Sequence, residues 1–198
     1  MTSAARRESP EELNAAWLCP GMHVEERPLR FFHGGCHKSR RMKGLIRVRK
    51  TKVLFVCGQN TARSQMAEAI LKELGGDAFE VESAGLEAGP GINPLAVEVM
   101  KEIGLDISNN EVTKVFDLFV AGRTYHYVIS VCDAAKAQRC PVFPGICERR
   151  HWPFDDPASF EGSWEERVAA TRRVRDQIRE AVEALIAEVK AAQSGSSR

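Results

Sequence analysis

Three features that would place this chain in a membrane, secreted or nucleic-acid-binding class are missing. No apolar run in its 198 residues approaches the length of a membrane-spanning helix. The N-terminus lacks the apolar core of a secretion signal. The net charge is only +1, which gives no strong reason to expect a nucleic-acid partner. We therefore expect a cytoplasmic protein, acting as a monomer, without membrane or nucleic-acid partners.

The small net charge hides an uneven distribution. Residues 1–50 carry 11 Lys and Arg against 5 Asp and Glu, whereas residues 51–198 carry 17 against 22. The first segment also shows no sustained helical or strand period. We predict a disordered extension over 1–50, one domain over 51–192 and a frayed tail over 193–198. The change in composition makes Met42 a candidate start of the native chain.

Cysteines are few, but their positions are informative. Six cysteines in a cytoplasmic chain favour catalysis or redox chemistry over a structural disulfide framework. Cys19 and Cys36 lie in the N-terminal segment among three histidines, but their spacing matches no zinc pattern. We expect no metal there. The other four are Cys57, Cys132, Cys140 and Cys147.

The hydrophobic pattern predicts strands that alternate with helices. Strands are expected over 51–57, 79–83, 126–131 and 151–154, and helices over 63–74, 94–104, 115–121 and 163–190. Ser163 and Glu166 form the capping-box pattern that starts the last helix, in which Arg172, Arg173 and Arg175 are expected to face solvent. This order predicts an α/β fold with three layers, a four-stranded, mainly parallel sheet carrying helices on both faces.

One stretch organises the rest of the sequence. The apolar run 53–56 leads directly to Cys57, and Arg63 and Ser64 follow at the start of a helical pattern. A strand, a short loop and a helix N-terminus in this order direct backbone N–H groups at one spot, which favours an oxyanion. The same field should stabilise the thiolate of Cys57. Arg63 can clamp two oxygens of the anion, and Ser64 can donate a hydrogen bond to the sulfur.

The loop residues Gly58, Gln59, Asn60, Thr61 and Ala62, together with Arg63, are therefore the expected substrate-binding residues. Ligands of parallel sheets bind outside the carboxyl ends of the strands. Cys132 ends the third predicted strand, so we expect it at the same edge as Cys57. The alternative without chemistry is a buried cysteine beside a surface arginine.

The segment Cys57-Gly-Gln-Asn-Thr-Ala-Arg-Ser-Gln-Met-Ala-Glu68 resembles the phosphate loop of the low-molecular-weight protein tyrosine phosphatase fold. Cys132, Cys140-Pro-Val-Phe-Pro-Gly145 and His151-Trp-Pro-Phe-Asp-Asp-Pro157 add a resemblance to its thioredoxin-coupled arsenate reductases. The resemblance covers roughly residues 51–190. It implies a redox enzyme without a cofactor.

The resemblance also implies how the thiols act. Cys57 attacks the arsenic of arsenate, Cys132 then attacks Cys57 and releases arsenite, and Cys140 leaves a Cys132–Cys140 disulfide for thioredoxin or a similar dithiol. Asp156, directly before Pro157, matches the family's general acid and is preferred over Asp155. Cys147 is a weaker candidate for the resolving thiol.

Spacing adds a physical constraint on that disulfide. If residues 133–139 were helical, the Cα atoms of Cys132 and Cys140 would lie about 12 Å apart at roughly 1.5 Å per residue. A disulfide needs about 4.4–6.8 Å. The segment 134–138 is a good helix former, so we expect disulfide formation to unwind it.

Two alternatives and one departure remain open at this point. The protein could be a phosphatase that uses Cys57, Arg63 and Asp156 through a phosphocysteine. It could also be a non-catalytic oxyanion binder or sensor. Glu68 and Ser83 match two positions of a potassium site in some relatives, but Thr113 stands where an Asp is expected, so we expect no metal.

Overall fold

The computed structural model describes residues 50–133 and 138–195. Its central sheet is entirely parallel, with strand order β2-β1-β3-β4. The strands are β1 (Thr51–Cys57), β2 (Phe79–Gly85), β3 (Tyr127–Ser130) and β4 (Glu148–His151). The helices are α1 (Arg63–Gly75), α2 (Pro94–Lys101), α3 (Val115–Val120) and α5 (Trp164–Gly195), with short 3-10 turns η1 (Gly76–Ala78) and η2 (Pro157–Ser159).

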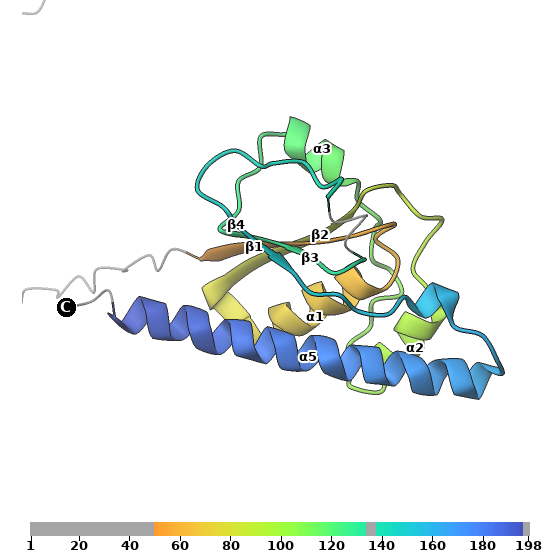
Figure 1. Ribbon diagram of the computed structural model, residues 1–198. Coiled ribbons are helices and arrows are strands. Elements are labelled where there is room, and N and C mark those ends of the chain that lie inside the picture. The colour runs from red at the N-terminus through yellow and green to blue at the C-terminus, as the bar shows by residue number, and fades with distance from the viewer. Residues whose placement is uncertain (1–49, 134–137, 196–198) are drawn as a thin grey trace, which may run out of the picture. The chain divides into compact units, whose positions relative to one another are not determined.

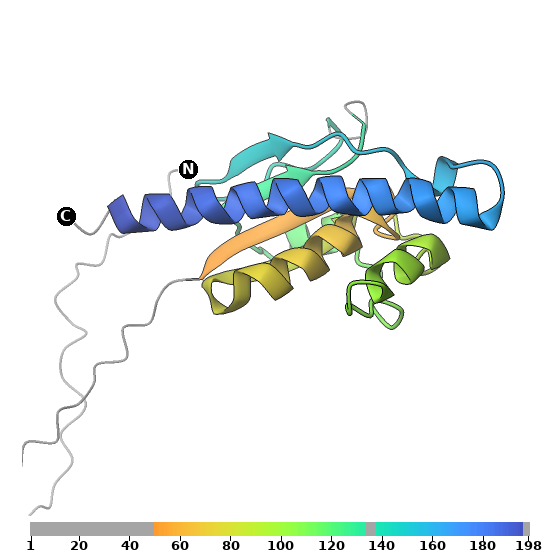
Figure 2. The same ribbon diagram turned by 90° about the horizontal axis from the view of Figure 1, so that it is seen from below.

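The three-layer arrangement confirms the predicted fold class. Helices α1, α2 and α5 cover one face of the sheet, and α3 lies on the other (Figure 1). Viewed from below, α5 runs the length of its face beside α1 and α2 (Figure 2). None of the helices in the described part of the chain is long and apolar enough to cross a membrane.

The alternation of side chains along β1 divides the core into two clusters. Val53, Phe55 and Cys57 point into a large cluster with α1, α2 and α5. Leu54 and Val56 point the other way, into a smaller one. The small cluster is completed by Ala84, Val115, Tyr125, Val128, Cys140 and Phe143. Both faces of β1 are therefore covered by apolar side chains, as expected for a central strand of a parallel sheet.

The strand register brings the functional ends of β1 and β3 together. Val56 pairs with Ser130. The N–H of Val131 also donates to the carbonyl of Val56 at 2.8 Å. Cys57 and Cys132, which follow these positions, therefore leave the sheet at the same edge. The predicted neighbourhood of the two cysteines is confirmed.

The fourth strand is displaced from its predicted position. The structure forms β4 at 148–151 rather than at 151–154. The prediction followed the aromatic run around Trp152, but Pro153 lacks an N–H for the ladder. The charged Glu-Arg-Arg-His sequence of β4 suits an exposed edge strand. The helix expected over 94–104 likewise ends early, at Lys101.

The long helix α5 is fixed at its start and along its length. Ser163 and Glu166 exchange the two hydrogen bonds of the predicted capping box, at 2.8 and 3.3 Å. Arg175, expected in solvent, is instead buried and donates to the carbonyl of Val99 at 2.9 Å. Arg172 and Arg175 both bind Glu102, which ties α5 to the end of α2.

The predicted boundaries of the domain lie close to the ends of the described residues. The extension over 1–50 lies almost wholly outside the described residues, as do Met42, Cys19 and Cys36. Helix α5 runs to Gly195, three residues past the predicted end of the domain at 192. The helix predicted between Cys132 and Cys140 also falls largely on residues outside the description, 134–137, and stays a prediction.

Candidate active site

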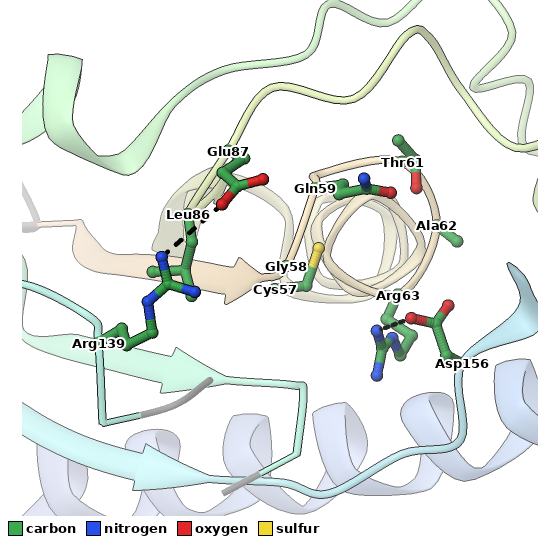
Figure 3. Close-up of a pocket in the computed structure, with 10 residues that line it drawn as sticks. All are labelled: Cys57, Gly58, Gln59, Thr61, Ala62, Arg63, Leu86, Glu87, Arg139 and Asp156. Carbon is green, nitrogen blue, oxygen red and sulfur yellow. Dashed lines mark hydrogen bonds and ion pairs between the residues drawn. The ribbon is translucent and has the colours of Figure 1, made fainter. Parts of the chain in front are cut away.

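Cys57 ends β1 beneath a tight loop that leads into α1. Its side chain is only 3% exposed, and its sulfur points into the ring formed by the loop (Figure 3). Ala62, the residue before α1, has no side chain that could cap the helix. The first N–H groups of α1 are therefore left for an external acceptor, and the helix dipole favours an anion there.

A neighbouring segment holds the loop in this orientation. The N–H groups of Leu86, Glu87 and Gly89 donate to the carbonyls of Cys57, Gly58 and Gln59, each at 3.0 Å. These bonds turn the loop carbonyls away from the centre, which leaves the N–H groups to face inward. Gly85 permits the approach, because a Cβ there would lie 2.7 Å from the backbone nitrogen of Asn60.

Asn60 is the internal brace of the loop. Its φ of 57° is the single positive value for a non-glycine residue within the described ranges 50–133 and 138–195, a conformation that Asn adopts more readily than most residues. The side chain is fully buried, and its amide makes four hydrogen bonds. The partners are Ser64 Oγ (2.9 Å), Ser83 Oγ (2.8 Å), Gln65 Nε2 (3.1 Å) and the N–H of Thr113 (2.8 Å).

This network gives the Asn60 side chain a structural part that the sequence did not reveal. The side chain points into the protein and does not line the pocket, and the predicted substrate contact of Asn60 stays a prediction. Its backbone N–H instead donates to the Cys57 sulfur at 3.0 Å. Gln65, which sequence reasoning missed, extends the brace by donating to the carbonyl of Glu111 at 2.9 Å.

Ser64 takes up the position expected of it. Its hydroxyl lies 3.0 Å from the Cys57 sulfur, and both residues are buried. The Nδ2 of Asn60 donates to the same hydroxyl oxygen, which leaves the hydroxyl proton free to point at the sulfur. A thiolate can only accept, so with Cys57 ionised the bond runs from Ser64 to sulfur.

Arg63 and Asp156 form the second wall of the site. Arg63 is 5% exposed; Nη1 donates to the carbonyl of Phe154 at 3.0 Å, and Nη2 pairs with the Asp156 carboxylate. Asp156 also accepts from the N–H of Ala158 at 3.1 Å, which fixes its carboxyl at the start of η2. Figure 3 shows the pair beside the sulfur of Cys57.

The two candidate acids differ clearly in position. Asp156 is partly buried and lines the pocket with Cys57 and Arg63, whereas Asp155 is exposed and does not line it. Packing of Trp152 against Phe55, with ring centroids 5.8 Å apart, brings this segment to the site. The geometry supports the choice of Asp156 made from the sequence.

The remaining thiols occupy different faces of the sheet. Cys132 is fully buried in the large cluster that also contains Cys57. Cys140 is 5% exposed and belongs to the small cluster on the opposite face, with Cys147 packed against it. The structure thus places Cys57 and Cys132 in one cluster and Cys140 in the other, against which Cys147 packs. A Cys132–Cys140 bond requires the chain around Cys140 to move.

The pocket over Cys57 has walls that sequence reasoning missed. Its volume is about 250 Å³, and Gly58, Gln59, Thr61 and Ala62 line it as expected. Leu86, Glu87 and Arg139 complete the lining. Glu87 and Arg139 form an ion pair at 3.7 Å on the side away from Asp156 (Figure 3). The position of Leu86 and Glu87 just after β2 was a usable signal, because ligands bind beyond strand carboxyl ends.

This architecture matches a known family. The family model described as low molecular weight phosphotyrosine protein phosphatase covers residues 52–194. The chain belongs to this family. Its match with an arsenate reductase of Bacillus subtilis (strain 168) is 44% identical over 126 residues, covering 64% of this chain and 88% of the relative.

Two solved structures agree with that assignment. One, described as an arsenate reductase in the phosphate binding state, has a TM-score of 0.57 and 33% identity, with 70% of this chain and 98% of the other covered. The other is a thioredoxin-dependent arsenate reductase of Corynebacterium glutamicum, with a TM-score of 0.54 and 26% identity over 73% of this chain and 64% of that one. Both have the fold described above.

Proposed function

We propose that this protein is an arsenate reductase that uses Cys57, Cys132 and Cys140 in turn and is regenerated by thioredoxin or a similar dithiol protein. The observation that carries the proposal is the burial of a second thiol, Cys132, in the same cluster as the pocket nucleophile Cys57. A phosphatase needs the pocket but no second thiol. The similarity to arsenate reductases supports the same choice.

The first step uses the groups that surround the pocket. The thiolate of Cys57 attacks the arsenic while the loop N–H groups and Arg63 hold the remaining oxygens. One arsenate oxygen leaves as water with a proton from Asp156, which acts as the general acid.

The later steps move two electrons from sulfur to arsenic. The thiolate of Cys132 attacks the Cys57 sulfur, the sulfur–arsenic bond breaks with its electron pair going to arsenic, and arsenite leaves. Cys140 then attacks the Cys132 sulfur, which frees Cys57 as a thiolate and leaves a Cys132–Cys140 disulfide. All the residues come from one chain, so a monomer suffices, and a thiol relay of this kind suits the reducing cytoplasm.

The test traps each intermediate with a single equivalent of arsenate. In Cys140→Ser we expect a Cys57–Cys132 disulfide and one arsenite per protein, with no further turnover when a thioredoxin system is added. In Cys132→Ser we expect no arsenite and an arsenic adduct on Cys57. Non-reducing peptide mapping detects both species. Full arsenate turnover by Cys132→Ser would contradict the three-thiol relay. Hydrolysis of an aryl phosphate by the wild type without any release of arsenite would leave the phosphatase alternative in its place.

A further inference from the structure

The relay leaves one thiol without a part. Cys147 is half-buried at the start of β4 and packs against the small cluster that holds Cys140. Its sulfur lies 3.7 Å from the carbonyl of Glu148. The chain folds back between the two cysteines through Gly145, which has a φ of 95°. Cys147 therefore packs against the same small cluster as Cys140, on the same face of the sheet, before any reaction begins.

One cation, Arg149, acts on both thiols. Arg149 donates to the carbonyl of Cys140 at 3.4 Å. Burial raises the pKa of the Cys140 thiol; Arg149 opposes that rise, and nearby Cys147 adds to it. Burial likewise raises the pKa of Cys147, again opposed by Arg149. Arg149 is thus a cation common to both thiols, and it offsets part of the rise in pKa that burial causes.

We propose that Cys147 is a fourth thiol of the relay and that the disulfide passes from Cys132–Cys140 to Cys140–Cys147 before the protein is reduced. The cluster of Cys140, Cys147 and Arg149 on one face of the sheet carries the proposal. It rests on the proposed function, because arsenate supplies the oxidation.

The step is an internal exchange that needs no further oxidant. Cys147 gives its proton to solvent, and its thiolate attacks the Cys140 sulfur of the Cys132–Cys140 disulfide. The old S–S bond breaks, Cys132 leaves with the electron pair and takes a proton from solvent, and the Cys140–Cys147 bond forms. Attack falls on Cys140 because Cys132 belongs to the cluster on the other face.

Two consequences favour this direction of transfer. Cys140 leaves its buried place in the small cluster when it bonds to Cys132, and bonding to Cys147 lets it return. Cys147 is also less buried than Cys132 and Cys140. A reducing partner must reach one sulfur of the disulfide, so the transfer brings a more accessible sulfur to the surface.

The first experiment tests the pair apart from arsenate chemistry. In a full-length Cys132→Ser protein that also carries Cys19→Ser and Cys36→Ser, diamide serves as the thiol oxidant. We expect loss of two thiols and a Cys140–Cys147 link in non-reducing peptide maps. Ile146→Ser, a change at a fully exposed neighbour, is the matched control and should keep the link. Linkage of Cys57 in place of this pair, or no link at all, would overturn the proposal.

The second experiment follows one equivalent of arsenate in wild-type protein without reductant. We expect Cys57 and Cys132 to be alkylated after the reaction and Cys140 to be linked to Cys147. In Cys147→Ser we expect Cys132–Cys140 to accumulate and thioredoxin-coupled turnover to fall several-fold. A wild type that stops at Cys132–Cys140 would overturn the proposal. Absence of arsenite would overturn the proposed function instead, and the diamide experiment alone would then decide whether the pair exists.

Discussion

The loop at Cys57 and the segment around Cys140 hold their cysteines in opposite ways. In the loop, Asn60 alone makes four side-chain hydrogen bonds of 2.8 to 3.1 Å. Around Cys140, Arg149 donates to the Cys140 carbonyl at 3.4 Å, and Val142 and Ile146 are 71% and 100% exposed. The first thiol is held in one geometry, whereas the second sits where local opening requires fewer contacts to break.

This difference matches the two kinds of chemistry in the proposal. Oxyanion binding and attack gain from groups that are already in place, because no reorganisation is then needed during the reaction. Transfer of a disulfide requires the opposite, since Cys140 starts on the other face of the sheet from Cys132. We infer that the protein separates a fixed reaction site from a movable thiol by placing them on opposite sides of β1.

The largest expected effect concerns Asp156, the proposed general acid of the Cys57 site. Asp156→Asn should lower arsenate turnover by roughly 10²–10⁴-fold, the usual range for loss of general acid catalysis. Asp155→Asn is the matched control, because Asp155 is exposed and does not line the pocket. Steady-state assays with a thioredoxin system measure both. Equal losses in the two variants would show that the acid has been assigned to the wrong residue.

The next effect tests whether Asn60 is a brace or a substrate contact. Asn60→Ala removes four buried hydrogen bonds and leaves their partners unpaired, so we expect the free energy of unfolding to fall by about 2–4 kcal/mol. Asn60→Gly keeps the positive φ without strain and should lose somewhat less. Urea denaturation measures both. An unchanged stability with a raised KM for arsenate would support the predicted role as a substrate contact.

Sequence reasoning placed the residues of the fixed site correctly because the loop is local. Cys57, Arg63 and Ser64 lie within eight residues, and a strand followed by a helix dictates their geometry. The strand β1 and the helix α1 were predicted to within one residue for the same reason. The predicted alternation of strands and helices also led to the correct fold class.

What the sequence could not supply depends on long-range contacts. Asn60 stands in the loop that we expected to bind substrate, and only the positions of Ser83 and Thr113 reveal that its side chain is already hydrogen-bonded within the protein. Arg139 reaches the pocket through an ion pair with Glu87, more than fifty residues away. The strand at 148–151 was misplaced because its charged residues carry no hydrophobic period.

A smaller effect concerns the ion pair between Glu102 and Arg172, which lies outside both the Cys57 loop and the segment around Cys140. The side-chain hydrogen bond from Arg172 is the main cause that lowers the pKa of Glu102. The stabilisation that the Glu102–Arg172 pair contributes is therefore present above the pKa of Glu102 in the unfolded chain. It is lost as the pH falls through the lower pKa of Glu102 in the folded protein. Glu102→Gln should cost about 1 kcal/mol of unfolding free energy at pH 7, because water screens the pair with exposed Arg172 and the buried Arg175 keeps its hydrogen bond to the carbonyl of Val99.

The pH dependence separates this effect from packing. The difference in unfolding free energy between wild type and Glu102→Gln should shrink towards zero when urea denaturation is repeated at successively lower pH, beginning below the ordinary glutamate pKa of 4.5. A difference that stays constant across this range would assign the loss to packing between α2 and α5. Arsenate turnover at pH 7 should be unaffected, because the pair contributes nothing to either thiol region.

The smallest expected effect lies in the movable region itself. Ile146 is fully exposed, so Ile146→Ser removes no buried apolar area, and the free energy of unfolding should change by no more than about 0.5 kcal/mol. Phe143, three residues earlier, is the contrast: it is 4% exposed and meets Tyr125 edge-on at 5.1 Å. Phe143→Ala should lower the free energy of unfolding by about 3–5 kcal/mol. That result would show that Phe143 packs into the core while Ile146 nearby contributes little. A loss of more than 1 kcal/mol of unfolding free energy in Ile146→Ser would mean that Ile146 makes stabilising contacts of its own. The segment around Cys140 would then be as firmly held as the Cys57 loop, and the proposed difference between the two thiols would be wrong.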